Sequence, residues 1–254
     1  MKKFTGFSTI GVIIGVALVA LLGVATFAVV DANNKATDFS SYDFNTIIEA
    51  NKDNGNIGDH VKGDPDAPVL IFEYADYQCP GCASINPKVN KAIEKADGKL
   101  AIVYRSYLLA YHQNGTAAAS AAEAAGLQGY WKEYANKLFA EQAEWEGATG
   151  SERSALFEKY FDEVSNGKGD MDKFREDLGS DEVSKKISFD MGVGKRVDIQ
   201  ATPAFYVDGQ WINWSEAGSV TVDGEVVEWD SARGGDEFVN LLLEIVEAKT
   251  GKKE

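Results

Sequence analysis

The chain opens with a continuous apolar segment. Residues 4–30 contain no charge, and residues 10–30 consist almost wholly of Val, Ile, Leu, Ala and Gly, long enough at about 1.5 Å per residue to cross a bilayer. Lys2 and Lys3 precede this segment, so the positive-inside rule keeps the N-terminus in the cytoplasm and sends the remainder across the membrane. We interpret residues 1–30 as an uncleaved single-pass anchor in the cell membrane, with a cleaved signal peptide as the alternative.

The polar pattern of residues 31–60 is typical of a linker. Asn, Asp, Ser and Gly occur throughout, interrupted by one short amphipathic segment at 42–50. The run Gly-Asp-Pro-Asp-Ala-Pro at 63–68 then contains several turn-forming residues. A compact domain is therefore expected to begin next to this run.

Strand and helix patterns alternate at the start of this domain. Residues 69–74 form a nearly continuous apolar run, which is typical of a strand buried on both faces in a sheet with parallel pairing. Apolar residues at helical spacing follow at 79–96, and a second apolar run follows at 100–105. Residues 61–112 thus predict a right-handed β-α-β unit and an α/β fold.

The pattern changes to helical spacing over residues 113–195. Alanine-rich and aromatic segments separated by glycines predict about four helices there. Strand patterns return in residues 196–250, with hairpins at 204–212 and 220–227. The last helix carries a core-facing apolar stripe from 238 to 246. The α/β domain is therefore expected in two parts, on either side of a helical insertion.

Composition and charge exclude several classes of function. The chain has 25 Lys and Arg against 40 Asp and Glu, a net charge of −15, which argues against a nucleic-acid partner because nothing resembles a basic patch. With Lys2 and Lys3 in the cytoplasm, 23 basic residues face 40 acidic ones, which leaves −17 on the exported part. The chain has two cysteines, which excludes a disulfide-stapled scaffold and a four-thiolate metal site.

Both cysteines belong to a Cys-x-x-Cys motif at the predicted helix N-terminus. A thiolate is the nucleophile in thiol exchange, and unpaired N–H groups at a helix N-terminus stabilise it. Cys79 has this position, and Cys82, one turn later, is placed to resolve a mixed disulfide. Pro80 contributes no N–H, so Gly81 and Cys82 are the nearest donors. The spacing favours a redox-active pair.

Two other interpretations of the motif are open. The cysteines could form half of a zinc site with His60 and His112, although the spacing suggests no finger or ribbon. They could also form an inert bridge, but so short a loop constrains the unfolded chain little. The redox interpretation requires neither a metal nor a cofactor.

Two further positions support redox chemistry. Glu73 lies in the apolar run before Cys79, where burial would raise its pKa and let it exchange a proton with Cys82. The alternative is a solvated carboxylate at the strand end. Thr202-Pro203 directly precedes a predicted strand, so this bond is a candidate for the cis form, and the free backbone edge there could pair with an extended peptide.

Two segments together resemble a known family. These are Glu-Tyr-Ala-Asp-Tyr-Gln-Cys-Pro-Gly-Cys at 73–82 and Val-Asp-Ile-Gln-Ala-Thr-Pro-Ala-Phe-Tyr-Val-Asp-Gly at 197–209, on either side of the helical insertion. They resemble the DsbA-like thiol:disulfide oxidoreductases, most closely the membrane-anchored bacterial kind. The resemblance covers residues 61–248.

The resemblance implies a thioredoxin fold interrupted by a helical domain and preceded by a transmembrane helix and linker. It implies that Cys79 attacks, that Cys82 resolves, and that Pro203 is cis. Glu73 matches the family's buried acid. Thr202, Pro80 and Gly81 are then expected to contact substrate.

Three features depart from the family pattern. Position 81 is glycine where the strongly oxidising enteric enzyme has histidine, which removes one source of thiolate stabilisation. Thr202 before the proline is shared by reductases, isomerases and oxidases. Residues 213–233 are longer than expected, and the sequence indicates no role for them.

Three functions remain as hypotheses. The leading one is an extracytoplasmic oxidase that introduces disulfides into reduced exported proteins and is reoxidised by a quinone-linked membrane enzyme of the DsbB or VKOR-like type. A reductase or isomerase would use the same site in the other direction. A membrane-tethered chaperone or binding module would keep the fold without turnover.

Overall fold

The computed structural model describes residues 37–232 and 235–251. The chain divides into two units, Met1–Asp38 and Phe39–Glu254, and the helices and strands that the structure describes belong to the second. The membrane anchor expected at residues 1–30 lies outside the described residues. In the described ranges, no helix combines the length and the apolar character that spanning a membrane requires.

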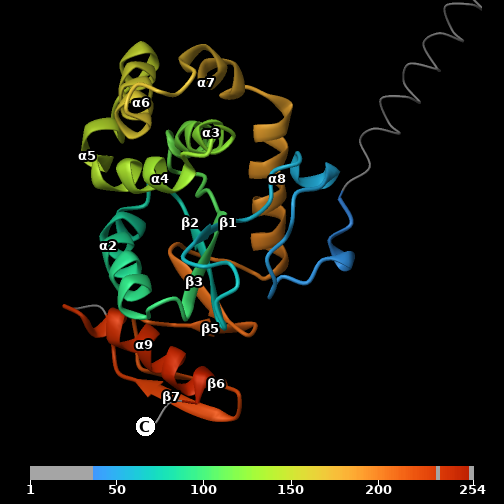
Figure 1. Ribbon diagram of the computed structural model, residues 1–254, viewed down its shortest axis with the longest axis vertical. Helices are drawn as coiled ribbons and strands as arrows, with labels where there is room; N and C mark the ends of the chain where they lie inside the picture. The colour runs from blue at the N-terminus through green and yellow to red at the C-terminus, as the bar shows by residue number, and fades with distance from the viewer. Residues whose placement is uncertain (1–36, 233–234, 252–254) are drawn as a thin grey trace, which may run out of the picture. The chain divides into compact units, whose positions relative to one another are not determined.

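A five-stranded mixed sheet forms the centre of the second unit (Figure 1). Its strand order is β1-β3-β2-β4-β5, and the strands are β1 (His60–Lys62), β2 (Val69–Ala75), β3 (Leu100–Ser106), β4 (Ala204–Val207) and β5 (Gln210–Ile212). β2 pairs in parallel with β3 and antiparallel with β4. This central place explains the continuous apolar run of β2, because both faces of the strand are covered. The predicted β-α-β unit and first hairpin are confirmed.

Two helices cover one face of the sheet. They are α2 (Pro80–Lys95) and α9 (Glu237–Thr250). The apolar face of α2 includes Ile85 and Val89, which join Phe205 and Phe238 in one buried cluster. Pro80 occupies the first turn of α2, where its missing N–H costs no helical hydrogen bond. The helix therefore begins directly after Cys79, with Pro80 in its first turn.

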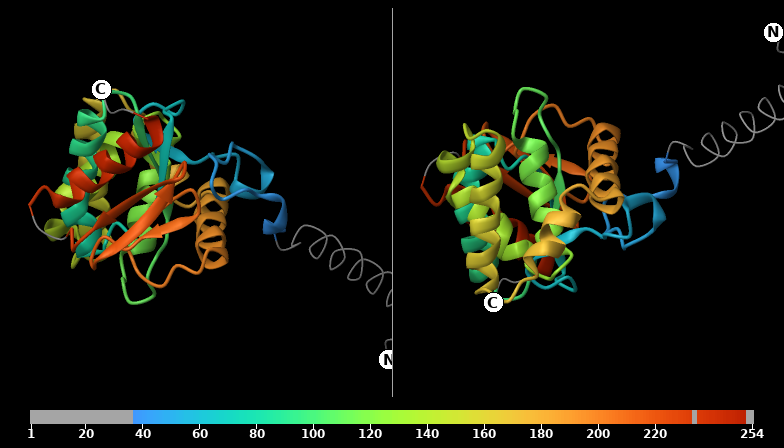
Figure 2. Two further views of the ribbon diagram at one scale, coloured as in Figure 1. Left: turned by 90° about the horizontal axis from the view of Figure 1, so that it is seen from below. Right: turned by 90° about the horizontal axis from the view of Figure 1, so that it is seen from above.

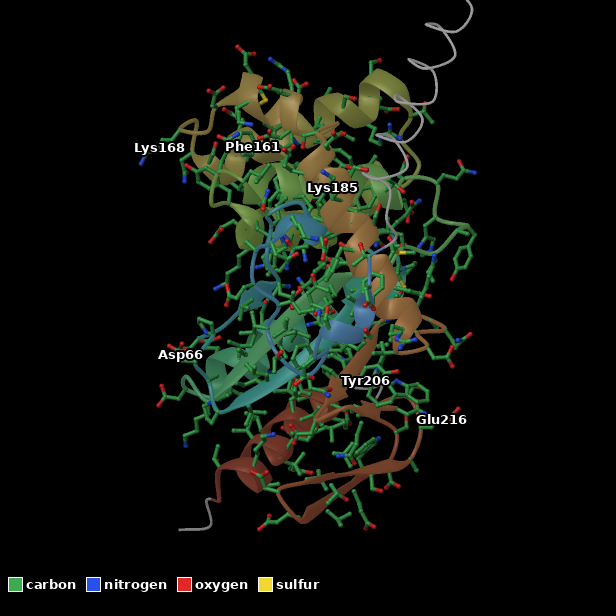
Figure 3. The ribbon with its side chains drawn as sticks, turned by 90° about the vertical axis from the view of Figure 1, so that its right-hand side faces the viewer. Asp66, Phe161, Lys168, Lys185, Tyr206 and Glu216 are labelled. Atoms are coloured by element: carbon green, nitrogen blue, oxygen red, sulfur yellow. The ribbon has the colours of Figure 1, made fainter. Side chains whose placement is uncertain are left out.

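Six helices form the insertion between β3 and β4. They are α3 (Gly115–Gly126), α4 (Trp131–Ala140), α5 (Gln142–Trp145), α6 (Gly150–Ser165), α7 (Met171–Asp177) and α8 (Asp181–Arg196). The alanines of α3 are buried at the centre of this part, among aromatic side chains such as Tyr134 and Phe161. Figure 3 labels Phe161. The sequence predicts about four helices, and the difference lies in short α5 and α7. The side chain of Asp170 caps α7, which makes it a helix separate from α6.

The long segment before α9 extends the core. It contains the hairpin β6 (Gly218–Val222) and β7 (Glu225–Trp229), which confirms the second predicted hairpin. Val220 and Val222 are buried in the cluster under α9. The Gln210 side chain exchanges two hydrogen bonds with the backbone of Thr221 and so joins the hairpin to β5.

The segment from Phe39 to β1 differs from the expected linker at residues 31–60. It packs beside α8, as both views in Figure 2 show, and the ring centroids of Phe39 and Phe189 are 5.3 Å apart. Ile48 is buried in the same cluster. The sparse apolar residues of this polar segment are therefore core residues, and the packed unit begins at Phe39.

A buried ion network holds this segment to the sheet. Asp59 pairs with Arg105 at 2.7 Å and with Lys186 at 3.5 Å, and Lys186 also pairs with Asp190 at 2.7 Å. These side chains are at most 1% exposed. Burial would raise the pKa of Asp59, but the two cations outweigh burial and lower it. The Ile48 N–H also donates to Asp59 at 2.9 Å.

Replacing Asp59 by Ala should lower the free energy of unfolding by about 3 to 5 kcal/mol, because it leaves Arg105 and Lys186 buried without their shared carboxylate. Denaturant unfolding measures this change. The matched control is Asp172→Ala, which removes an ion pair to Arg175 at a carboxylate that is 95% exposed and should change stability by no more than about 0.5 kcal/mol. Equal effects of the two substitutions would contradict the assigned role of the network.

Candidate active site

Cys79 is the N-cap residue of α2, at the end of a short loop that follows β2. Its backbone is extended, with φ −74° and ψ 121°. The Cys79 N–H donates to the Asp76 carbonyl at 3.0 Å, which closes the turn. The predicted position of the motif at a helix N-terminus is confirmed, and both cysteines are free thiols in this structure.

The surroundings of Cys79 stabilise its thiolate. The Cys82 thiol, which donates a hydrogen bond, is the largest cause that lowers the pKa of Cys79 to about 5. Burial opposes the shift, while Thr202 and the backbone N–H groups of Cys82 and Gly81 add to it. When protonated, the Cys79 thiol donates to the Thr202 carbonyl at 3.2 Å. Its side chain remains 7% exposed, so an incoming thiol has a narrow approach.

The pKa of Cys82 is shifted in the opposite direction to that of Cys79. Cys82 has no exposed surface, and burial raises its pKa well above the ordinary value. A neighbouring Cys79 thiolate and Glu73 raise it further, and a hydrogen bond from the Asp76 backbone N–H opposes them. The pair therefore consists of one cysteine with a lowered pKa and one buried cysteine with a raised pKa.

Glu73 lies on β2, paired with Phe205 on one side and with Tyr104 on the other. It is 1% exposed, and neither carboxylate oxygen has a hydrogen-bond partner within residues 37–232 and 235–251. Burial raises the pKa of Glu73 to about 7, and the positive charge of Lys62 opposes the shift. The solvated alternative for Glu73 is therefore wrong. A carboxyl group with this pKa exchanges protons near neutral pH.

Lys62 is a buried charged residue near Glu73 that the sequence did not reveal, because β1 is too short to show an apolar pattern. It is fully buried, and its Nζ donates to Asn86 Oδ1 at 2.5 Å. Burial lowers the pKa of Lys62, while the charge of Glu73 opposes that shift. Lys62 on β1 and Glu73 on β2 are thus both buried, on strands separated by β3, and each charge favours the charged form of the other.

The Thr202-Pro203 bond is cis, which confirms the prediction. Pro203 faces the motif: a Cβ added at Gly81 would lie 3.1 Å from Pro203 Cδ and 3.6 Å from Cys79 Sγ. In the described structure, the backbone N–H groups of residues 200–202 have no hydrogen-bond partner, and Gln200 and Ala201 are exposed. An extended chain could therefore pair with this edge beside Cys79.

A pocket of about 300 Å³ adjoins the edge at residues 200–202. Its walls include Thr202, Pro203 and three aromatic residues, Tyr206, Trp211 and Trp214. Trp211, on β5, is 55% exposed, and Figure 3 marks the positions of Tyr206 and Glu216 in this part of the chain. The pocket therefore offers apolar surface next to the cysteines.

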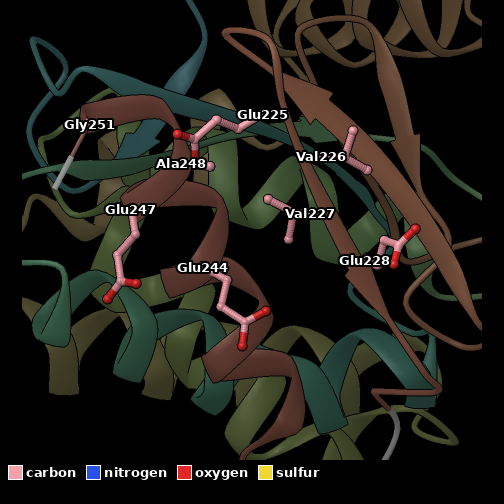
Figure 4. A pocket seen from close by; sticks show the side chains of 8 residues that line it. All are labelled: Glu225, Val226, Val227, Glu228, Glu244, Glu247, Ala248 and Gly251. Atoms are coloured by element: carbon pink, nitrogen blue, oxygen red, sulfur yellow. The ribbon is translucent and has the colours of Figure 1, made fainter. Parts of the chain in front are cut away.

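A second pocket, of about 400 Å³, lies between β7 and α9. Figure 4 shows the glutamates that line it, Glu225 and Glu228 from β7 and Glu244 and Glu247 from α9. None of the predicted site residues is among its walls.

The two histidines considered as zinc ligands have separate carboxylate partners. His60 Nε2 lies 2.7 Å from Glu123, and His112 Nδ1 lies 2.8 Å from Asp76. Within the described ranges, no group of three or more His, Cys, Asp and Glu residues is arranged to hold a metal ion. Asp76 also accepts from the Gln78 N–H at 2.9 Å and so shapes the loop before Cys79.

Comparison with known proteins gives a family and a set of similar folds. A family model described as Thioredoxin matches residues 55–223. Curated relatives include the Na⁺/H⁺ antiporters NhaA 1 of Mycolicibacterium gilvum and NhaA 3 of Salinispora tropica, each 32% identical over 60% of this chain. The match covers 24% and 22% of those proteins, so the chain spans about a quarter of their length.

Similar solved structures include a thioredoxin-like oxidoreductase from Silicibacter pomeroyi, 26% identical with a TM-score of 0.51, covering 64% of this chain and 88% of that one. BdbD from Bacillus subtilis is 20% identical with a TM-score of 0.56, covering 83% and 100%. Alpha-DsbA1 from Wolbachia pipientis is 22% identical with a TM-score of 0.55, covering 76% and 93%. At these identities, the last two show a common fold.

The substitution Glu73→Gln should remove a pH dependence from the stability of the oxidised protein, in which the cysteines do not titrate. Because the folded pKa of Glu73 is raised, its stabilising contribution is present below about pH 4.5 and is lost as pH rises through about 7. The stability of the parent relative to Glu73→Gln should therefore fall by roughly 3 kcal/mol between these values. Denaturant unfolding across this range tests it, and a constant difference would contradict a buried, titrating Glu73.

Proposed function

Because the chain belongs to the thioredoxin family, we propose that it is an extracytoplasmic, DsbA-like thiol:disulfide oxidoreductase that introduces disulfides into exported proteins. The observation that carries the proposal is the position of Cys79 at the N-cap of α2, 3.2 Å from the Thr202 carbonyl and next to fully buried Cys82, where the pKa of Cys79 is lowered to about 5. This value lies between about 7 for thioredoxin and about 3.5 for DsbA. A stabilised thiolate favours the reduced pair over the disulfide, which makes the disulfide an oxidant.

The first step is attack on the Cys79–Cys82 disulfide. A substrate thiolate bonds to Cys79 Sγ, the Cys79–Cys82 bond breaks, and Cys82 leaves with the electron pair. Because burial raises the pKa of Cys82, the leaving sulfur takes up a proton. Glu73, with its pKa raised to about 7, supplies that proton, and Lys62 stabilises the carboxylate that remains.

The second step releases the oxidised substrate. A second substrate thiolate attacks the substrate sulfur of the mixed disulfide, a new substrate disulfide forms, and Cys79 leaves as a thiolate. The low pKa of Cys79 makes it a good leaving group. Two substrate thiols are oxidised to a disulfide and the protein pair is reduced, so a further oxidant must restore the enzyme.

Substrate recognition uses the surface beside the motif. An extended substrate segment pairs with the free N–H groups at residues 200–202. Pro80 and Gly81 lie beside the path by which this segment reaches Cys79. The pocket at Trp211 accepts an apolar side chain of the same segment. Reduced exported proteins present such extended segments before they fold.

The location and the redox partner complete the proposal. The apolar segment at residues 4–30, with Lys2 and Lys3 before it, supports a single-pass anchor with the catalytic part outside the cytoplasm. A quinone-linked membrane reoxidase of the DsbB or VKOR-like type would then regenerate the disulfide. A reductase or isomerase using the same cysteines is the alternative, and the reduction potential separates the two.

Equilibration with glutathione tests the direction of exchange. The Cys79–Cys82 pair should have a reduction potential clearly less negative than the roughly −270 mV of thioredoxin. A value at or below that of thioredoxin would refute the oxidase. A separate peptide-oxidation assay distinguishes an enzyme from a binding module. Cys79→Ser should abolish oxidation of a reduced peptide by an enzyme, whereas a binding module without turnover would keep its biological effect in that variant.

Replacing Trp211 by Ala should raise the KM for an apolar peptide substrate about fivefold, the equivalent of ~1 kcal/mol of lost contact, with little change in kcat. Steady-state oxidation of a two-cysteine peptide measures both constants. Tyr111→Ala is the matched control, because Tyr111 is 75% exposed and does not line the pocket. A KM unchanged by Trp211→Ala would exclude the pocket from substrate binding.

A further inference from the structure

One side chain of the helical insertion contacts the loop that carries Cys79. Gln142 is the first residue of α5 and is 8% exposed. Its Nε2 donates to the Tyr77 carbonyl at 2.7 Å and to the Cys79 carbonyl at 3.1 Å. Both partners are acceptors, so the NH₂ group and not the oxygen of the amide must face the loop.

These two bonds act together with other hydrogen bonds of the loop. Asp76 accepts from the N–H groups of Gln78 and Cys79, through its side chain and its carbonyl respectively. The carbonyls of Tyr77 and Cys79 face α5, and Gln142 binds both, while the Cys79 carbonyl also accepts from the Ala83 N–H at 3.1 Å. One amide thus holds the Tyr77–Gln78 peptide plane and the Cys79–Pro80 peptide plane together.

The insertion holds α5 firmly in place. The Trp145 side chain is fully buried, and its indole N–H donates to the Leu138 carbonyl at 2.9 Å. Asn114 donates to the carbonyls of Trp145, Glu146 and Ala148 at 2.9 to 3.2 Å. The amide of Gln142 is therefore presented from a rigid support.

We propose that Gln142 is a positioning residue, through which the helical insertion holds Cys79 where the N–H groups of Gly81 and Cys82 face its sulfur. This role rests on the proposed function only in taking Cys79 as the reacting thiol. Without the Gln142 amide, the Tyr77 carbonyl loses its donor and the Cys79 carbonyl keeps only the Ala83 N–H, so the loop relaxes. Cys79 then loses part of its alignment with the N–H groups and with the Cys82 thiol.

The substitution Gln142→Met tests this role, because it keeps the length of the side chain and removes both donors. In the reduced protein, the thiolate titration of Cys79, followed by ultraviolet absorbance and by the pH dependence of alkylation, should shift upward by about one unit, a tenfold loss of thiolate below the midpoint. The reduction potential should become more negative in the same variant. A shift smaller than about twofold in the thiolate equilibrium would overturn the proposal.

Gln128→Met is the matched control. Gln128 forms a comparable pair of bonds, to the backbone of Asp170, with both distances 2.9 Å. It belongs to the same insertion but contacts no residue of the motif loop, so its loss should leave the Cys79 titration unchanged. Equal shifts in the two variants would show a general effect of a weakened insertion and would refute a specific role of Gln142.

A second variant covers the case in which Gln142→Met does not fold. Gln142→Glu retains the size and polarity of the side chain but places an acceptor with negative charge against the two carbonyls, so it should raise the Cys79 pKa at least as far. An unchanged titration in Gln142→Glu would refute the role of the amide. Because titration needs no substrate turnover, failure of the oxidase proposal would leave these measurements intact, and the two failures are distinguishable.

Discussion

Burial of Cys82 under the first turn of α2 is the constraint on which the site depends. It raises the pKa of Cys82, keeps that thiol protonated, and so supplies the hydrogen bond that most strongly lowers the pKa of Cys79. The same desolvation extends to Glu73 on β2, whose raised pKa suits proton exchange near neutrality. Both cysteines are buried in the cluster that they share with Tyr104 and the insertion helices, so desolvation shifts the pKa of Cys82 and that of nearby Glu73 together.

The fold contains two buried lysines whose surroundings differ. Lys186 bonds directly to Asp190 and lies near Asp59, and despite burial these carboxylates raise its pKa. In this network Lys186 keeps its charge, whereas burial raises the pKa of its partner Asp190 to about 6. Lys62 bonds to Asn86 instead, and burial lowers its pKa. The network around Lys186 attaches the segment that begins at Phe39 to the sheet. Lys62 instead carries a charge that burial disfavours and that Glu73 favours.

Local patterns predict the part of the fold that carries the chemistry. The apolar run of β2, the helix N-terminus at Cys79 and the cis bond before Pro203 each depend on neighbouring residues, and the structure confirms them. Asp59 and Gln142 were not predicted, because each acts through partners tens of residues away in sequence. A polar residue in a polar segment gives no signal of burial. The ion pairs of Asp59 and the hydrogen bonds of Gln142 can therefore be identified only in the folded structure.

Glycine at position 81 has a structural reason that bears on the redox direction. A Cβ there would come within 3.1 Å of Pro203 Cδ, closer than most such contacts, so a larger residue would displace the proline or the loop. The histidine found there in the strongly oxidising enteric enzyme is absent, yet the pKa of Cys79 is lowered to about 5 by Cys82 first, then by Thr202 and backbone N–H groups. Thiolate stabilisation in this chain therefore depends on the alignment of α2 with its neighbours, and any contact that fixes the loop before Cys79 also adjusts its reactivity.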